Sequence, residues 1–350
     1  MKKPITGPWT LADLRAGKIG APKNGLKVFS CFHCGGGSTM GYKLAGFDVL
    51  GGIEIDTEMM RLYRQNHQPQ EHLSMLMPIQ DFMAIPRENI PKELFELDVL
   101  DGSPPCSSFS MAGSREKEWT NKKAFREGQT TQVLDDLFFH FIKVADILRP
   151  KVVIAENVKG LIQGNAKGYV RDIFRSFTAA GYDTQLFLLN ASRMGVPQSR
   201  ERTFFIARRR DLSFPKIALE FNETPIPFSA IDQGNIEDDA LALTATANKW
   251  WPRCLRGKSF SSVHPKGSLF NWIKVHPDKP LNTLASGNAR LMFHWEQKRI
   301  LSDIEWTRGQ SFPDDYNFLN ADPRYVCGMS VPPLMMHRVA AAVRDQLLKK

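Results

Sequence analysis

Residues 101–110 read Asp-Gly-Ser-Pro-Pro-Cys-Ser-Ser-Phe-Ser and place one thiol, Cys106, directly after two prolines. Each proline ring fixes its own φ and restricts the residue before it, so the backbone that carries the thiol is constrained. The apolar run from Leu94 to Leu100 predicts a buried strand that ends at Asp101. Cys106 then lies in a loop at the carboxyl end of a strand, where open α/β sheets bind ligands. This position favours nucleophilic catalysis over an incidental cysteine in a turn.

Two further charged motifs accompany buried segments. Glu156 stands in Ala-Glu-Asn-Val at the end of an apolar run, where a carboxylate is costly unless it meets a partner. It is therefore either half of a structural ion pair or a catalytic group. The sequence Gln-Ser-Arg-Glu-Arg at 198–202 opens another strand, in which Arg200 and Arg202 alternate towards one face and suit phosphate or carbonyl recognition. Taken singly, each motif is explained equally well by a solvated charge or a salt bridge.

A glycine-rich turn, Cys-Phe-His-Cys-Gly-Gly-Gly at 31–37, lies between a predicted strand and a predicted helix. Glycines allow the backbone to approach a ligand at a helix N-terminus, as nucleoside sites require. Glu54 ends the second predicted strand, where a carboxylate can bind ribose hydroxyls. Cys31 and Cys34 form a Cys-x-x-Cys pair, but no second Cys or His pair at ligand spacing follows, so we expect no metal.

Short apolar runs alternate with amphipathic stretches over the first two-thirds of the chain. This rhythm predicts an α/β fold with a doubly wound, mostly parallel sheet that positions the motifs. From about residue 208 the rhythm dissolves, and the Pro-, Asn-, Ser- and Trp-rich stretch 211–282 predicts a small, irregular second domain. The expected strands are 26–32, 48–53, 96–100, 152–155, 184–189 and 203–207, and the expected helices are 57–65, 131–148, 169–180 and 333–348.

Composition indicates the partner and the compartment. The chain has 350 residues, with 46 basic against 37 acidic residues and a formal charge of +9, which favours a polyanionic partner such as nucleic acid. The five unevenly spaced cysteines suit a reducing compartment better than a disulfide framework. The sequence shows neither a signal peptide nor an apolar run of transmembrane length. We therefore expect a cytoplasmic protein with no membrane partner.

The order glycine-rich turn, Pro-Pro-Cys, Glu-Asn-Val and Gln-x-Arg-x-Arg resembles the DNA cytosine-5 methyltransferase family of bacterial or phage type. The resemblance runs from about Val28 to Val343 and continues with motifs that begin at Arg299, Phe312 and Gly328, which read Arg-Ile-Leu-Ser-Asp, Phe-Pro-Asp-Asp-Tyr and Gly-Met-Ser-Val. The chain departs from the family pattern at two places. Cys34 stands where the family has the first glycine of Phe-x-Gly-x-Gly-Gly, and Met329 stands where it has asparagine.

The resemblance implies the fold of class I S-adenosylmethionine-dependent methyltransferases with a target-recognition domain. It divides the chain into an N-terminal extension (1–25), a catalytic domain (26–210), a target-recognition domain (211–282) and a returning C-terminal segment (283–350). It implies that a cytosine flips out of duplex DNA, Cys106 adds to carbon 6, and a methyl group passes to carbon 5. Glu156 would bind the N3 and N4 edge of the base and Arg202 its O2, while Arg200 would order the site.

The resemblance also implies the remaining site residues and partners. S-adenosylmethionine would be the methyl donor, no metal would take part, and double-stranded DNA would be the substrate. We expect a monomer in the cytoplasm, associated with the nucleoid, and a cognate restriction endonuclease that acts separately. The implied cofactor-binding residues are Phe32, Gly35, Gly36, Gly37, Glu54, Ile55, Asp81, Phe82, Pro104, Leu137, Ser330 and Val331, and the implied substrate-binding residues are Pro105, Ser110, Gln198 and Thr283.

Two alternatives remain open at this point. One is an RNA cytosine-5 methyltransferase of the same fold, but transfer-RNA members carry Cys-Phe-Thr in the recognition region, whereas here Cys254 is followed by Leu255. The other is a catalytically silent DNA-binding regulator, although such a protein gains nothing from intact Cys106, Glu156 and Arg202. Within 211–282, the cluster Trp250, Trp251, Arg253, Arg256 and Lys258 is either a set of DNA contacts or a small core with a basic rim.

Overall fold

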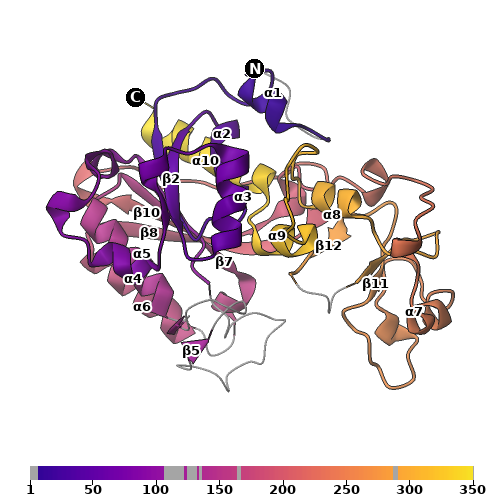
Figure 1. Cartoon of the computed structure of the whole chain (residues 1–350). Coiled ribbons are helices and arrows are strands. Elements are labelled where there is room, and N and C mark those ends of the chain that lie inside the picture. Colours follow the sequence, from indigo (N-terminus) through magenta and orange to yellow (C-terminus); the bar gives the residue numbers. More distant parts are fainter. Residues whose placement is uncertain are drawn as a thin grey trace. The chain divides into compact units, whose positions relative to one another are not determined.

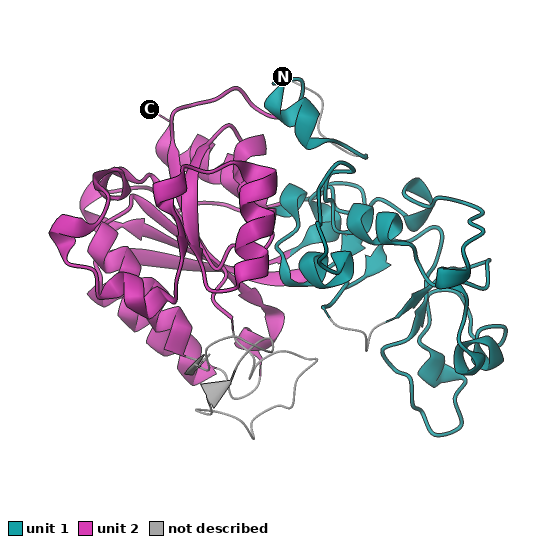
Figure 2. Cartoon of the chain, viewed as in Figure 1, with its two compact units in different colours: residues 1–19, 190–200, 221–335 teal, residues 20–189, 201–220, 336–350 magenta. Residues whose placement is uncertain are grey.

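The computed structural model describes residues 7–105, 122–123, 132–133, 136–163, 167–286 and 291–349, so Cys106 and Ser110 lie outside the described residues. The chain forms two compact units (Figure 2). Unit 1 comprises residues 1–19, 190–200 and 221–335, and unit 2 comprises residues 20–189, 201–220 and 336–350. Because each unit draws on three separate segments, neither forms from one continuous stretch of sequence.

Unit 2 contains a seven-stranded sheet in the order β3-β2-β1-β4-β7-β10-β8 (Figure 1). The neighbours from β3 to β7 pair in parallel, and β10 pairs antiparallel with β7. Parallel neighbours end at the same edge of the sheet, so the loops that follow β1, β2, β4 and β7 gather there. The strands are β1 (Lys27–Cys31), β2 (Asp48–Glu54), β3 (Ser74–Leu76), β4 (Val99–Gly102), β7 (Val152–Val158), β8 (Tyr182–Asn190) and β10 (Glu201–Arg209).

Helices cover both faces of this sheet. Phe205 and Ala207 of β10 pack in one cluster with residues of α5 and α6, whereas the alternate residues Phe204 and Ile206 are fully buried and face the opposite way. A sheet buried on both faces is the doubly wound arrangement that the sequence predicts. The helices of unit 2 are α2 (Gly37–Leu44), α3 (Thr57–His67), α4 (Ile79–Met83), α5 (Leu137–Leu148) and α6 (Lys167–Ala179), and α10 (Pro333–Val343) enters it from residue 336 onward.

The observed elements correct the sequence prediction at three places. The helix expected over 131–148 begins only at Leu137, and Gln132–Val133 forms a short ladder with Lys122–Lys123 instead. The strand expected from residue 96 begins at Val99, because Lys92–Glu96 is a turn of 3-10 helix. Strand β3 and helix α4 were not expected. Both are too short for a hydrophobic period to show in the sequence.

Unit 1 has little regular structure, as its composition indicates. Its small core contains Trp250, Trp251, Cys254, Phe260 and Phe293. Tertiary packing in this core supports the helix at Ala245–Trp250 and the strand at Met292–Phe293, which are too short to be stable alone. The elements are α1 (Leu11–Arg15), β9 (Gln198–Ser199), α7 (Ala245–Trp250), β11 (Ile273–Lys274), β12 (Leu281–Asn282), β13 (Met292–Phe293), α8 (Asp303–Gly309) and α9 (Pro323–Met329).

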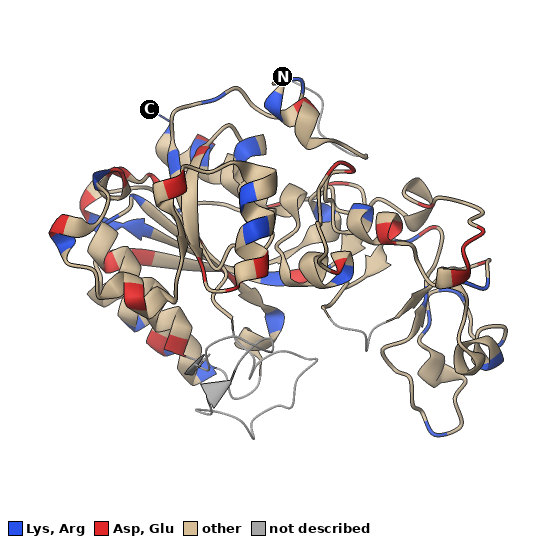
Figure 3. Ribbon diagram, in the orientation of Figure 1, with Lys and Arg blue, Asp and Glu red and all other residues tan. Residues whose placement is uncertain are grey.

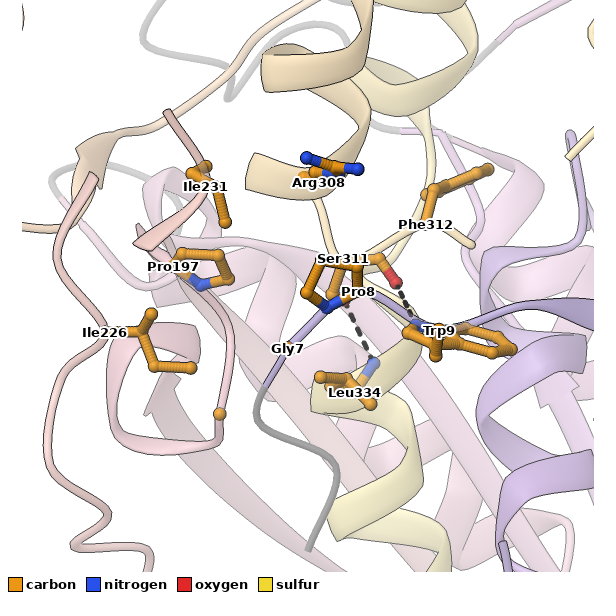
Figure 4. Close-up of a pocket in the computed structure, with 11 residues that line it drawn as sticks. Gly7, Pro8, Trp9, Pro197, Ile226, Ile231, Arg308, Ser311, Phe312 and Leu334 are labelled. Carbon is orange, nitrogen blue, oxygen red and sulfur yellow. Dashed lines mark hydrogen bonds between the residues drawn. The ribbon is translucent and has the colours of Figure 1, made fainter. Parts of the chain in front are cut away.

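The start of the described chain is part of unit 1. Trp9 is buried, its indole N–H donates to the carbonyl of Ser311 at 3.0 Å, and the Asp315 carboxylate accepts from the amide of Ala12 at 3.0 Å. Figure 4 shows the apolar hollow beside Trp9, which Pro197, Ile231 and other unit 1 residues line. Gly7, Pro8 and Trp9 form part of its lining, so the hollow is where the start of the described chain packs. None of the described residues that line it is a predicted site residue.

One helical stretch in the described part of the chain, Pro323–Leu348, is long and apolar enough to span a membrane by length and composition. Its most apolar window is 72% buried inside the structure. Burial of this kind is what the core helix of a globular protein shows.

Candidate active site

The loop that leads to Cys106 is held from the neighbouring strand. Pro104 is buried and Pro105 is half-buried directly after β4. The side-chain amide of Asn157, on β7, donates to the Pro104 carbonyl at 3.0 Å. The Thr203 hydroxyl donates in turn to the Asn157 carbonyl at 3.1 Å. Asn157 therefore fixes the chain two residues before the predicted nucleophile, a function that the sequence motif did not reveal.

Glu156 and Arg202 form an ion pair beside this loop. The guanidinium Nε of Arg202 lies 3.0 Å from a carboxylate oxygen of Glu156, and the two side chains are 13% and 10% exposed. The antiparallel register pairs Arg202 with Val158 and Phe204 with Glu156, so tertiary pairing of β7 and β10 brings the two charges together. A second guanidinium nitrogen donates to the Glu201 carbonyl at 2.8 Å, which orients the arginine. The pair is mostly, though not wholly, removed from solvent.

Asp101, near the end of β4, is a buried carboxylate that the sequence analysis did not select. It accepts from the Ser30 hydroxyl at 2.6 Å and from the Tyr42 hydroxyl at 3.2 Å. Burial, together with the nearby Glu156 charge, raises its pKa to about 7 despite these hydrogen bonds. It therefore connects β1 and α2, which flank the glycine-rich turn, to the strand that precedes Cys106. In the sequence, Asp101 is recognisable as a carboxylate that ends an apolar run.

The glycine-rich turn surrounds the carboxylate of Glu54. One Glu54 oxygen accepts from the amide of Cys34 at 2.9 Å, and the other accepts from the amides of Ile55 and Asp56 at 2.9 and 3.0 Å. Burial raises the pKa of Glu54, and these amides oppose that effect. Cys34 has φ +49° and Gly36 has φ +81°. The cysteine thus adopts the left-handed conformation that explains a glycine at this position in the family pattern.

Aromatic residues pack behind the same turn. The His33 ring stacks on Tyr63 with centroids 3.7 Å apart, and His67 Nε2 lies 3.0 Å from the Gly35 carbonyl. A Cβ built on Gly36 would collide with the His67 ring. Burial lowers the pKa of His33 to about 4, so its ring is neutral at physiological pH. These contacts fix one side of the turn.

The other predicted cofactor-binding residues are divided between the units. In unit 2, Phe32 and Ile55 are half-buried and Asp81 is exposed, whereas Phe82 and Leu137 are fully buried in the core. In unit 1, Ser330 and Val331 are buried, and the Ser330 hydroxyl donates to the Val326 carbonyl at 2.8 Å.

Arg200, Gln198 and Thr283 belong to one hydrogen-bonded group in unit 1. The buried Arg200 donates to the carbonyls of Leu284 at 2.6 Å and Gly328 at 2.9 Å. Gln198 is fully buried and accepts from the amide of Leu284 at 2.9 Å, while the Thr283 hydroxyl donates to the Ser199 carbonyl at 2.9 Å. Arg200 thus binds backbone carbonyls of the chain itself, whereas Arg202 pairs with Glu156.

A second buried charged cluster in unit 1 supports structure. Asp232, His294 and Glu305 form the one group among the described residues whose ligand atoms lie close enough together to hold a metal ion. Arg299 already binds both Glu305 oxygens at 2.7 Å. The Arg299 guanidinium is therefore the cation of this cluster. The Arg-Ile-Leu-Ser-Asp motif, which begins at Arg299, is explained as a structural element.

Comparison with known proteins identifies relatives along nearly the whole chain. The model of the C-5 cytosine-specific DNA methylase family matches residues 26–345. The type II methyltransferase M1.HphI of Haemophilus parahaemolyticus is 30% identical over 338 residues, covering 91% of this chain and 86% of the relative. M.NgoPII of Neisseria gonorrhoeae is 28% identical, covering 93% of this chain and 97% of the relative. A solved E. coli structure, assigned as a prophage-encoded DNA modification methyltransferase, has a similar fold with a TM-score of 0.70 at 19% identity, covering 92% of this chain and 99% of its own.

Proposed function

The chain belongs to the C-5 cytosine-specific DNA methylase family, and from this premise we propose that it methylates carbon 5 of a cytosine flipped out of duplex DNA, with Cys106 as the nucleophile. Carbon 5 of cytosine is a poor nucleophile, so the ring needs covalent activation. The Cys106 sulfur bonds to carbon 6, and the resulting electron density at carbon 5 takes the methyl group. Loss of the carbon 5 proton and departure of the sulfur then restore the aromatic ring and the free thiolate.

The observation that carries this proposal is the Glu156–Arg202 pair beside the clamped Pro104 loop. We assign Glu156 to the N3 and N4 edge of the flipped base, where its carboxylate accepts from the N4 amino group and favours a proton on N3 as carbon 6 is attacked. We assign Arg202 to O2, because its permanent charge stabilises the electron density that develops on that oxygen. The ion pair supports these assignments because it orients both groups while they remain accessible at about one-tenth exposure.

We assign unit 1 residues to positioning. Arg200 and Gln198 both bind Leu284, and therefore fix the Thr283–Leu284 backbone without direct contact with the base. Thr283 would contact the flipped nucleotide, as would Pro105 and Ser110, which lie on either side of Cys106 in the sequence. Residues 211–282 would contribute the target-recognition domain.

S-adenosylmethionine is the methyl donor that the family uses, and the glycine-rich turn fits it. When bound, this group supplies an electrophilic methyl. The turn lies at the carboxyl end of β1, and Glu54 is fixed by three amides at the end of β2, where a carboxylate meets ribose hydroxyls. Ile55, which is half-buried, would cover one face of the adenine in preference to Phe82, which has no exposed surface. The other contacts would come from Phe32, Gly35, Gly36, Gly37, Asp81, Pro104, Ser330 and Val331, whereas Leu137, like Phe82, has no exposed surface.

The relatives' description as type II methyltransferases supports a place in restriction and modification. We propose that the protein acts on DNA in the cytoplasm as a monomer, beside a separate endonuclease of the same specificity. The net charge of +9 favours this polyanionic substrate.

Covalent trapping tests the proposal. Duplex DNA that contains 5-fluorocytosine retains the adduct, because fluorine at carbon 5 prevents the final proton loss. With the methyl donor present, we expect a denaturation-resistant adduct for the wild type and for Cys254→Ser, and none for Cys106→Ser. A gel shift should show that Cys106→Ser still binds DNA. An adduct that persists in Cys106→Ser would refute the nucleophile, and equal trapping on transfer RNA would favour the RNA enzyme.

A further inference from the structure

The region around α7 has an unusual charge composition. Residues 240–277 include Lys249, Arg253, Arg256, Lys258 and Lys266, all exposed, and contain no Asp or Glu at all. Figure 3 shows blue segments along this part of the ribbon. A stretch of this length without one acidic residue does not neutralise its own charge, so its electrostatic complement is a polyanion.

Two of the three tryptophans of this region are not available for contact with a partner. Trp250 and Trp251 are buried in the core of unit 1 with Cys254 and Phe260. Lys274 is also buried, and its ammonium lies 3.6 Å from the centroid of the Trp251 ring. Of the two interpretations left open by the sequence, Trp250 and Trp251 therefore match the small core, and the residues that this core supports at the surface are accessible to a partner.

The core presents a tight turn at residues 255–258. The amide of Lys258 donates to the Leu255 carbonyl at 3.1 Å, and Gly257 has φ +78°, which allows the reversal. The Gly257 amide donates to the Lys274 carbonyl at 2.7 Å, and the buried Cys254 thiol faces the Lys258 carbonyl at 3.4 Å. The turn is therefore anchored at its base, and its tip is rigid.

Two side chains of this turn have the character of recognition residues. Leu255 is 71% exposed, although a polar side chain at this position would avoid the free-energy cost of placing a large apolar surface in water. Arg256 is exposed, yet its guanidinium stacks over Trp295 at 4.3 Å from the ring centroid. Trp295 donates to Asp232 at 3.0 Å and is thereby fixed to the buried Arg299 cluster. Stacking reduces the entropy that Arg256 loses on binding.

We propose that the turn 255–258 reads base pairs in the major groove, with Arg256 donating to a guanine and Leu255 making the adjacent apolar contact. The inference rests on the proposed function and names the residues that determine its specificity. A planar guanidinium donates two hydrogen bonds to O6 and N7 of guanine, and an aliphatic side chain matches a thymine methyl group. Arg253, Lys258 and Lys266 supply phosphate contacts that position the turn without selecting a sequence.

The test measures the sequence specificity of methylation on a duplex library with randomised positions, read by bisulfite sequencing. The variants are Arg256→Ala, Arg256→Lys and Leu255→Ala. The matched controls are Arg171→Ala on α6 and Leu188→Ala on β8, which remove an exposed arginine and an exposed leucine of unit 2. Thermal melting confirms that each variant folds.

We expect Arg256→Ala to lose roughly 5- to 150-fold of the discrimination for guanine at one position of the site, because one bidentate base contact gives that ratio. Arg256→Lys should not restore it, because an ammonium lacks the planar pair of donors. Leu255→Ala should relax an adjacent position, and the controls should leave the site unchanged. An unchanged site in Arg256→Ala, or an equal loss of methylation at every sequence, would overturn the proposal. Absence of methylation by the wild type would refute the proposed function instead.

Discussion

Replacing Asp101 with asparagine should make the protein more stable at alkaline pH relative to the wild type. Burial raises the Asp101 pKa from 3.8 to about 7, so the ionised form is disfavoured in the folded protein. The contribution of Asp101 to the folding free energy is therefore most favourable below pH 3.8, where the carboxyl is protonated in both the folded and the unfolded protein. It becomes less favourable as the pH rises towards about 7, where the folded protein also ionises, and it changes little above that. The asparagine amide has no charge to bury at any pH. It also accepts from Ser30 and can donate to the Tyr42 hydroxyl, which either gives or takes a hydrogen bond.

The size of the effect follows from the two pKa values. At ~1.4 kcal/mol per pKa unit, ionised Asp101 costs the folded protein roughly 4 kcal/mol well above pH 7. At about pH 5 the unfolded chain is already ionised and the folded protein is not, so the cost is roughly 1.5 kcal/mol. The difference between Asp101→Asn and wild type should therefore move by roughly 2.5 kcal/mol in favour of the variant between about pH 5 and pH 8.

Urea unfolding of both proteins at several pH values measures this difference directly. Titrating groups that do not interact with Asp101 are common to both proteins and cancel in the comparison. Asp172→Asn, at an exposed position on α6, is the control and should show no trend. A constant difference between Asp101→Asn and wild type across this pH range would refute the assignment of Asp101 as a buried carboxylate with a raised pKa.

Substitutions at three other positions test two contacts and one backbone conformation. Gly36→Ala should destabilise the protein by roughly 2 kcal/mol in urea unfolding, because the added Cβ collides with His67 and φ is +81° at this position. The same change should weaken cofactor binding in calorimetry. Unchanged binding would contradict the rigid turn. Cys34→Gly should be more stable than Cys34→Ala by about 1 kcal/mol in the same assay, since only the alanine variant keeps a side chain at φ +49°. Arg299→Met should cost about 3–5 kcal/mol because it leaves Glu305 buried and unpaired, and a loss below about 1 kcal/mol would show that the pair is not needed.

The strands of the sheet could be predicted because their apolar runs are continuous. Lys27–Cys31 and Val152–Val158 are buried along nearly their whole length, as parallel strands covered on both faces must be. The order of the strands in the sheet could not be predicted, because hydrophobicity marks a strand without naming its neighbour. The antiparallel insertion of Glu201–Arg209 beside β7 is an example. It depends on the path of the chain through unit 1, which the local pattern does not contain.

The candidate site was predicted in part. Glu156 was selected because a carboxylate at the end of an apolar run needs a partner, and Arg202 because it alternates with Arg200 towards one face, but only the β7–β10 register showed that Glu156 and Arg202 are partners. Arg200 was selected for the same alternation and Gln198 through the family resemblance, and the structure directs both towards backbone groups of Leu284. Asp101 and Asn157 were not selected, since a single polar residue in an apolar run does not reveal whether its contacts serve the site.

The sequence by itself determined the family and the order of the motifs, because these depend on residue types and spacing. Only the tertiary structure decided which charged side chains form ion pairs, which contacts hold the glycine-rich turn, and which residues of the stretch 240–277 are exposed. Trp250 and Arg256 illustrate the difference, since one is buried in the core of unit 1 and the other is exposed on its surface. Burial depends on residues distant along the chain, such as Phe293 and Trp295, and local sequence does not contain that information.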